Sequence, residues 1–337
     1  MVGMMFEEAI DPDLSICDPH HHLWDGPGDR GRYLLDEYLR DAGGGHKIVK
    51  TVFVECGAMY RKDGPQEMRP VGETEFAQAM AAQNASGHRG TTEVAAAIVG
   101  FADLTLGAGV APVLEAHMAA SPNRFRGVRQ SCTWDADPAI LSMGKGKGMM
   151  GDAHFREGFA CLQKYGLSFD AWQYYTQLTE LADLARAFSD TTIILNHTGG
   201  PLGVGRYAGR GQEVFQEWKR GMTRLAYCPN VFVKLGGLGM ERCGFGWHGQ
   251  PKAPGSAEVA EKMMPYFRFC IEVFGPDRCM LESNFPVDKM SYSYTALWNA
   301  FKLICHDYSS QERAALFHDT AVKVYRLAAS EKTVGRK

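Results

Sequence analysis

The sequence lacks the features that mark a secreted, membrane-spanning or nucleic-acid-binding protein. Its apolar runs are short, as at Val94–Val99, whereas a spanning helix needs about 20 consecutive apolar residues. The formal net charge is −3, from 36 Lys and Arg against 39 Asp and Glu, so no basic excess is available for nucleic acid or an anionic membrane. Residues 1–13 contain no Lys or Arg, unlike a secretory signal. We therefore expect a cytoplasmic protein whose partner is a small molecule.

Paired cysteines are also missing. None of the nine cysteines forms a C-x-x-C pair, and the gaps between them run from 9 to 76 residues. This spacing argues against both a disulfide framework and a zinc ribbon, and predicts reduced thiols. The 337 residues contain no long linker, internal repeat or low-complexity segment. The sequence therefore predicts a single domain over residues 1–337, and it leaves open whether the chain forms a homodimer.

Short segments rich in β-forming residues alternate with longer segments of helical pattern. The predicted strands are Leu14–His22, Lys50–Cys56, Ala95–Ala102, Phe125–Ser131, Leu167–Trp172, Thr192–His197, Val231–Leu235 and Arg278–Asn284. The predicted helices are Glu73–Ser86, Gly109–Ala120, His154–Tyr165, Tyr174–Phe188, Gln212–Tyr227, Ala257–Phe274, Ser291–His306 and Gln311–Ala328. Eight such units favour an α/β fold closed into a (β/α)8 barrel, with an open doubly wound sheet as the alternative.

Polar residues gather where the predicted strands end, which is where a barrel builds its active site. His20 and His22 lie two residues apart on the first strand, so both point into the barrel while His21 points outward. Two imidazoles on one face form a half-site for a divalent metal, although a hydrogen-bonded pair without metal has the same spacing. His197 ends the sixth strand and is followed by glycines that free the backbone for a ligand.

Five stretches carry a resemblance to a known family. In order they read "DPHHHLWD", "FRGVRQ", "ILNHTGGP", "VFVKLGGL" and "RCMLESNFPVD". Together they resemble the amidohydrolase superfamily, in its amidohydrolase-related (amidohydrolase 2) branch, over roughly residues 14–328. That branch includes lactonases, among them 2-pyrone-4,6-dicarboxylate hydrolase and L-fuconolactonase, and also non-oxidative decarboxylases. The resemblance implies a distorted (β/α)8 barrel, in agreement with the strand count.

The resemblance also implies roles for individual residues. His20 and His22 match the H-x-H of the family's first strand, and His197 matches a histidine that precedes a glycine pair. Arg129 matches an arginine that contacts the substrate's carboxylate or carbonyl, and we expect the contact to be bidentate if the group is a carboxylate. Lys234 matches a lysine of the lactonase branch. The implied cofactor is one divalent metal, such as zinc held by His20, His22 and His197, or no metal at all.

One position departs from the family pattern. Where the family has an aspartate that acts as metal ligand and general base, this sequence has Asn284. An amide is a poor zinc ligand and has no basic lone pair at neutral pH. Two carboxylates could replace it: Glu282, which shares strand parity with Asn284, and Asp288, four residues further on. The sequence does not choose between them.

Further residues are candidates for contact with the substrate because they follow predicted strands. Glu55 ends the second strand, Trp172 and Tyr174 could form an aromatic wall, and Trp247 and His248 lie in a glycine-rich loop. The leading hypothesis is a hydrolase that opens a lactone of a sugar acid or of an aromatic ring-cleavage product. One alternative is a non-oxidative decarboxylase of an aromatic or enoic acid, and the other is a barrel that binds a ligand without turnover.

Overall fold

The computed structural model describes residues 7–26, 31–87 and 90–327. Eight strands form one sheet, and all of its neighbouring pairs run parallel. In sheet order they are β1 (Ser15–His21), β4 (Lys47–Val54), β5 (Glu93–Gly100), β6 (Phe125–Ser131), β7 (Ser168–Trp172), β8 (Ile193–Leu195), β9 (Val231–Leu235) and β10 (Cys279–Leu281). Every predicted strand is present, and the predicted distorted (β/α)8 barrel is confirmed.

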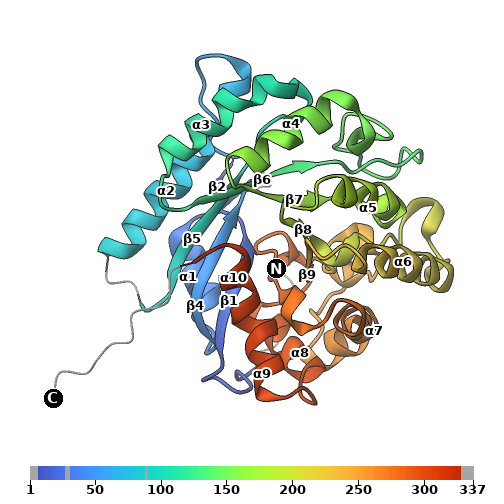
Figure 1. The fold of residues 1–337 in the computed structure, drawn as a ribbon. Coiled ribbons are helices and arrows are strands. Elements are labelled where there is room, and N and C mark those ends of the chain that lie inside the picture. Colours follow the sequence, from blue (N-terminus) through green and yellow to red (C-terminus); the bar gives the residue numbers. More distant parts are fainter. Residues whose placement is uncertain (1–6, 27–30, 88–89, 328–337) are drawn as a thin grey trace.

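Helices surround the strands (Figure 1). They are α1 (Leu35–Ala42), α2 (Val71–Ser86), α3 (Ala111–Ala120), α4 (Ala153–Lys164), α5 (Leu178–Ala187), α6 (Gly211–Ala226), α7 (Ser256–Phe274), α8 (Tyr294–Ile304), α9 (Ser310–Ala314) and α10 (Thr320–Val324). The sequence did not predict α1 or the short antiparallel pair β2 (Trp24–Asp25) and β3 (Arg32–Tyr33). Within the described residues, no helix is both long and apolar enough to cross a membrane.

The barrel closes between β1 and the segment that follows β10. His21 and Phe285 form an isolated parallel bridge. The main-chain N–H of His22 donates to the Phe285 carbonyl at 2.8 Å, and that of Asn284 donates to the His20 carbonyl at 2.9 Å. Closure at this point brings the two ends of the sheet together at its carboxyl edge, where the polar residues were predicted.

The C-terminal segment covers the opposite end of the barrel. The predicted helix Gln311–Ala328, whose last residue lies outside the described range, is divided into α9, a π-helical turn at Ala315–Asp319 and α10. Ser309 and Glu312 form a capping box at its start. Ala321, Val324 and Tyr325 pack with inward-facing strand residues in one buried apolar cluster, which includes Cys17, Val52, Val99, Ile194 and Met280. Among the described residues, the C-terminal segment therefore closes the lower end of the barrel, and the upper end, at the carboxyl edge of the strands, can take a ligand.

Candidate active site

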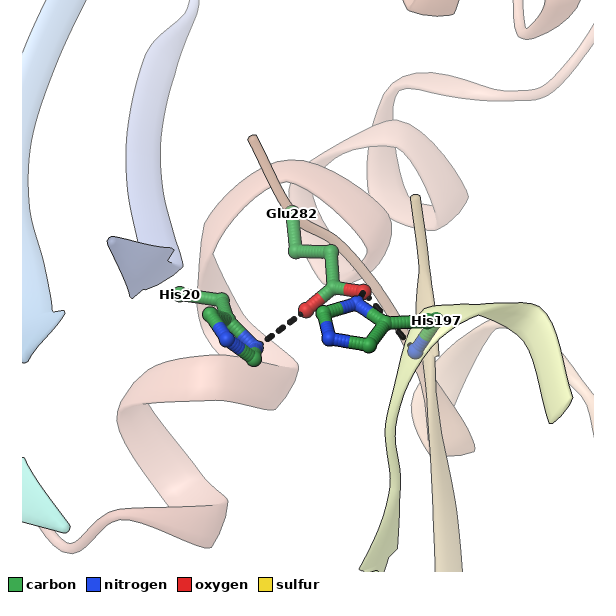
Figure 2. Close-up of side chains that lie close together, drawn as sticks. All are labelled: His20, His197 and Glu282. Carbon is green, nitrogen blue, oxygen red and sulfur yellow. Dashed lines mark hydrogen bonds and ion pairs between the residues drawn. The ribbon is translucent and has the colours of Figure 1, made fainter. Parts of the chain in front are cut away.

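Three side chains from distant parts of the chain meet at the floor of the upper barrel (Figure 2). His20 comes from β1, His197 follows β8, and Glu282 follows β10. Glu282 Oε1 accepts hydrogen bonds from the main-chain N–H of His197 at 2.9 Å and from its Nδ1 at 2.8 Å. His20 Nδ1 lies 2.6 Å from the other carboxylate oxygen, Oε2. All three side chains are buried, which makes this a preorganised group.

The backbone around His197 is held in an uncommon conformation. His197 and Thr198 have φ values of 53° and 54°, in the left-handed region that non-glycine residues seldom occupy. Gly237 lies against His197, and a Cβ at that position would be 2.4 Å from the Nδ1 atom of the histidine. Glycine is therefore required at 237 so that the imidazole can reach Glu282.

His22 stands beside this group without joining it. Its Nδ1 atom lies 2.8 Å from the Val54 carbonyl, so Nδ1 carries the hydrogen and Nε2 keeps its lone pair. Its ring centroid is 4.9 Å from that of His20. His21 points the other way, as predicted, and stacks on Tyr38 of α1 at a centroid distance of 4.4 Å. One potential ligand atom each of His20, His197 and Glu282 lies within 4.8 Å of the other two.

Arg129 is held by other residues of the site. Its Nε atom donates to Glu55 Oε1 at 2.7 Å, and Nη2 donates to the main-chain carbonyl of Glu55. Its Nη1 atom lies 3.2 Å from His20 Nε2. Three of the five guanidinium N–H groups are therefore engaged within the protein, so a substrate carboxylate would have to compete with Glu55 for bidentate contact.

A second ion pair lies directly beneath His20. Lys234 Nζ donates to Asp170 Oδ2 at 2.6 Å, and both side chains are fully buried. Lys234 Nζ also lies 3.4 Å from His20 Nδ1. From below, the hydroxyl of Tyr325 donates to the same carboxylate, 2.9 Å from Oδ2. Lys234 is thus a positioning residue below the site and does not line the cavity.

Asn284 and Asp288 form a separate pair. Asn284 Nδ2 donates to Asp288 Oδ1 at 2.8 Å, and only Asn284 lines the cavity. The other oxygen, Oδ2, accepts from the Tyr292 hydroxyl at 2.6 Å and from the Gly239 main-chain N–H at 2.9 Å. Asp288 is fully buried, and these contacts give it a structural role.

Burial and neighbouring charges shift the pKa values of the histidines and of Glu282 in the site. Burial, together with the cations of Lys234 and Arg129, holds the pKa values of His20 and His197 well below 6.5, and burial and Arg129 do the same to His22. These imidazoles are therefore neutral near pH 7. Burial raises the pKa of Glu282 to about 7, despite the opposing effect of Lys234.

A cavity of about 740 Å³ opens above this floor. Of the predicted residues, its lining includes His22, Glu55, Arg129, Trp172, His197 and Asn284. Tyr174, Trp247 and His248 do not line it; Tyr174 packs behind Trp172 at a centroid distance of 5.8 Å. The lining also includes residues that the sequence did not single out, notably Tyr60, Lys145 and Arg242. Tyr60 and Lys145 lie in loops and Arg242 lies in a short 3-10 helix (Glu241–Cys243), where neither strand parity nor a family motif could have identified them.

The floor group has the composition of a divalent-cation site. Two neutral imidazoles and one carboxylate are a ligand set that zinc accepts. Glu282 Oε2 is buried, and its 2.6 Å contact with His20 Nδ1 lacks the geometry of a hydrogen bond. These features fit a metal, with Glu282 in the place that the sequence assigned to His22. The positive charges of Lys234 and Arg129, on either side of His20, oppose the binding of a cation there.

Comparison with known proteins agrees with this architecture. The profile of the family described as amidohydrolase matches residues 17–327. The chain belongs to the amidohydrolase family. It is 36% identical over 335 residues to the uncharacterized protein y4mH of Sinorhizobium fredii, covering 94% of this chain and 99% of that protein. It is 25% identical over 327 residues to an L-fucono-1,5-lactonase of Burkholderia multivorans, covering 92% and 95%.

Solved structures share the fold. An amidohydrolase from Burkholderia multivorans with bound zinc has a TM-score of 0.70 at 24% identity, covering 93% of this chain and 99% of that one. A 5-carboxyvanillate decarboxylase from Novosphingobium aromaticivorans, with bound manganese, has a TM-score of 0.60 at 12% identity, covering 97% and 100%. At these identities the likeness concerns the fold alone. The family match and the lactonase relative support an ester-hydrolysing enzyme rather than a binding barrel without turnover.

Proposed function

We propose that this enzyme hydrolyses a lactone. The observation that carries the proposal is the pair formed by Glu282 and His197 at the cavity floor, with Nδ1 of the histidine 2.8 Å from the carboxylate. Because Nδ1 is held, Nε2 is the nitrogen left to act in the cavity that His197 lines. A histidine oriented by a buried carboxylate is a standard arrangement for taking a proton from an attacking nucleophile. The similarity to an L-fucono-1,5-lactonase supports the same reaction class.

In the proposed reaction, a water molecule in the cavity gives its proton to His197 Nε2 as its oxygen attacks the lactone carbonyl. Neutral His197 is the competent base, and its lowered pKa keeps it in that form. Glu282 orients the ring and stabilises the imidazolium that forms. When the tetrahedral intermediate collapses, the same nitrogen returns the proton to the ring oxygen that leaves.

Negative charge develops on the carbonyl oxygen as water attacks, and hydrogen-bond donors near that oxygen are needed to stabilise it. Arg129 lines the cavity and keeps two N–H groups that no residue described above engages. A fixed guanidinium in a buried site stabilises an oxyanion without further reorganisation. His22 cannot donate from Nε2 while its Nδ1 hydrogen is bonded to Val54, so we assign it to positioning the water.

The group that would hold a divalent cation consists of His20, His197 and Glu282. A cation bound there would supply Lewis-acid polarisation of the carbonyl and lower the pKa of a bound water. It would also occupy the one lone pair of neutral His197, so the proton transfer to Nε2 described above belongs to the enzyme without a cation. With or without it, Arg129, His22 and Trp172 shape the cavity around the scissile bond.

The proposal is tested by following acid release from a panel of γ- and δ-lactones at constant pH, with purified protein before and after chelation. We expect ring opening that His197→Asn reduces at least a hundredfold. Carbon dioxide release from aromatic and enoic carboxylic acids is measured in parallel. Decarboxylation without ring opening of any lactone would overturn the proposal in favour of the alternative reaction.

A further inference from the structure

The cavity wall is largely apolar. Phe101, Met149 and Met240 line it together with Leu141 and Met143, which belong to the loop after β6. Leu141 is 59% exposed and Met143 is 49% exposed, although both face a concave surface. Apolar side chains left exposed in a binding cavity are covered when a ligand with matching apolar surface enters. A volume near 740 Å³ also exceeds what a small ring by itself would fill.

The polar groups of the wall are largely engaged by the protein itself. The Gln130 amide donates to Asp103 Oδ1 at 2.9 Å and accepts a main-chain N–H. Lys145 Nζ donates to Asp103 Oδ2 at 2.6 Å, and Arg129 is paired with Glu55. A sugar lactone with a hydroxyl on most of its carbons would therefore find few free partners. Each unpaired buried hydroxyl would cost binding free energy.

Arg242 differs from the other cations of the cavity. Its Nη1 atom donates to the Tyr174 hydroxyl at 3.2 Å, and its guanidinium lies 5.8 Å from the centroid of the Trp172 ring. No carboxylate in the described part of the chain forms an ion pair with it, and the adjacent Glu241 instead lies 3.7 Å from His248. Lys145 and Arg129 both have acidic partners. Arg242 is thus a cavity cation whose charge is left for a ligand.

We propose that the substrate is a lactone bearing one anionic group and one bulky apolar substituent, rather than a polyhydroxylated sugar lactone. Arg242 binds the anion, and the apolar wall that includes Leu141 and Met143 covers the substituent. This inference rests on the proposed lactone hydrolysis and specifies its substrate class. Two features carry the inference: a cation without an acidic partner and an exposed apolar wall. They would contact different parts of a ligand.

Four probes separate the two recognition elements. Phenylparaconic acid is a γ-lactone with both a phenyl ring and a carboxylate, paraconic acid has only the carboxylate, and γ-phenyl-γ-butyrolactone has only the phenyl ring. L-fucono-1,5-lactone is the polyhydroxylated comparison. We expect kcat/KM for phenylparaconic acid to exceed that of each other probe by about tenfold or more, since it alone uses both elements. A higher kcat/KM for the sugar lactone would overturn the substrate class while leaving lactone hydrolysis intact.

Variants of Arg242 and Met143 test which residue recognises the anionic group and which recognises the apolar substituent. Arg242→Gln is expected to lower kcat/KM for phenylparaconic acid about tenfold or more, and that for γ-phenyl-γ-butyrolactone less than threefold. Met143→Gln is expected to reduce both aryl lactones relative to paraconic acid. Arg224→Gln and Met290→Gln are matched controls, because both side chains are exposed and lie outside the cavity. Equal losses on charged and neutral lactones in Arg242→Gln would contradict its assigned role.

Binding provides a readout that does not depend on turnover. By titration calorimetry, phenylsuccinate is expected to bind at least tenfold more tightly than succinate, and Arg242→Gln is expected to remove most of that binding. If no lactone is opened while phenylsuccinate still binds in this way, lactone hydrolysis is wrong and the ligand class stands. If phenylsuccinate and succinate bind equally, the apolar recognition is wrong.

Discussion

Glu282 and Asp288 are two carboxylates that differ only in their partners. Both are fully buried, and burial raises the pKa of each to about 7. Glu282 faces His20 and His197, whereas Asp288 is bonded to the hydroxyl of Tyr292 and to main chain. Titration therefore does not distinguish them, and geometry assigns the chemical role to Glu282.

Substitution of each carboxylate by its amide tests this assignment. Glu282→Gln is expected to lower kcat at least a hundredfold, because the imidazole loses the charge that orients and stabilises it. Asp288→Asn is expected to leave kcat within tenfold and to lower the melting temperature, because its role is to hold Asn284 and the Gly239 turn. Steady-state kinetics and thermal unfolding of the two variants give the comparison, and the reverse pattern would make Asp288 the functional carboxylate.

Arg129→Lys tests whether the enzyme needs the guanidinium contacts with Glu55 and His20. Lysine keeps the charge but cannot reach Glu55 and His20 at once, as the arginine does. We expect kcat/KM to fall tenfold or more, and the melting temperature to fall as well because Glu55 loses a buried partner. Kinetics on the best lactone and a thermal melt measure both effects. Wild-type activity would remove Arg129 from the site.

Asn284→Asp tests whether position 284 faces the cation site. The substitution adds a carboxylate to the cavity wall, which is expected to increase zinc affinity about tenfold or more. Asp288 lies 2.8 Å from this amide, so two carboxylates would share the position and one would keep a proton. The gain should therefore be larger at pH 8 than at pH 6. Titration calorimetry with zinc at both pH values measures it, and unchanged affinity would place residue 284 away from the metal.

At the scale of an element, the first turn of α2 organises the loop after β4. Glu73 Oε1 accepts main-chain N–H groups from Cys56 and Ala58, each at 2.9 Å. This fixes the segment directly after Glu55, the partner of Arg129. Burial, and then the nearby charge of Glu55, raises the pKa of Glu73 to about 8. A residue outside the cavity lining thus positions one end of the site.

The raised pKa predicts a specific pH dependence of stability. Between the ordinary glutamate pKa of 4.5 and a pKa of about 8, folded Glu73 holds a proton that the unfolded chain has released. The free energy of unfolding contributed by this group therefore falls as pH rises through that window, by at most about 1.4 kcal/mol per pH unit. Glu73→Gln removes the titration, so its stability should fall less steeply. Urea unfolding from pH 5 to 8 compares the two proteins, and identical slopes would contradict the assignment.

At the scale of the whole molecule, the two ends of the barrel are connected through its axis. The C-terminal segment closes the lower end, and Tyr325 bonds Asp170, which pairs with Lys234 below His20. In Figure 1 this segment, which includes α10, lies beside β1. The last described residues of the chain thus support the floor of the site from beneath.

Tyr325→Phe tests this support. It removes the hydroxyl that donates to Asp170 and leaves the ring in place, so we expect a stability loss of about 2 kcal/mol. The value of kcat should change less than tenfold, because Lys234 still holds the carboxylate. Tyr227→Phe is the matched control, since that side chain is 82% exposed and should change neither quantity. If the Tyr325→Phe variant were as stable as the wild type, the hydroxyl contact with Asp170 would not be a structural support.

Much of the fold could be predicted from local pattern. The alternation of short β-forming segments with helical segments located all eight strands, and the period of two along β1 assigned His20 and His22 inward and His21 outward. The antiparallel β2–β3 pair and α1 were not predicted, because two-residue strands and an eight-residue helix carry little periodicity.

What the sequence by itself determined is therefore the barrel, its family and the end at which the polar residues gather. Only the tertiary structure decided which partners those residues take. It joined Glu282 to His197, enclosed Asp288, engaged Arg129 with Glu55 and brought Arg242 to the cavity. The physical reason is that backbone period sets the direction of a side chain. Its hydrogen-bond partner depends on contacts between segments up to hundreds of residues apart, as between Tyr325 and Asp170.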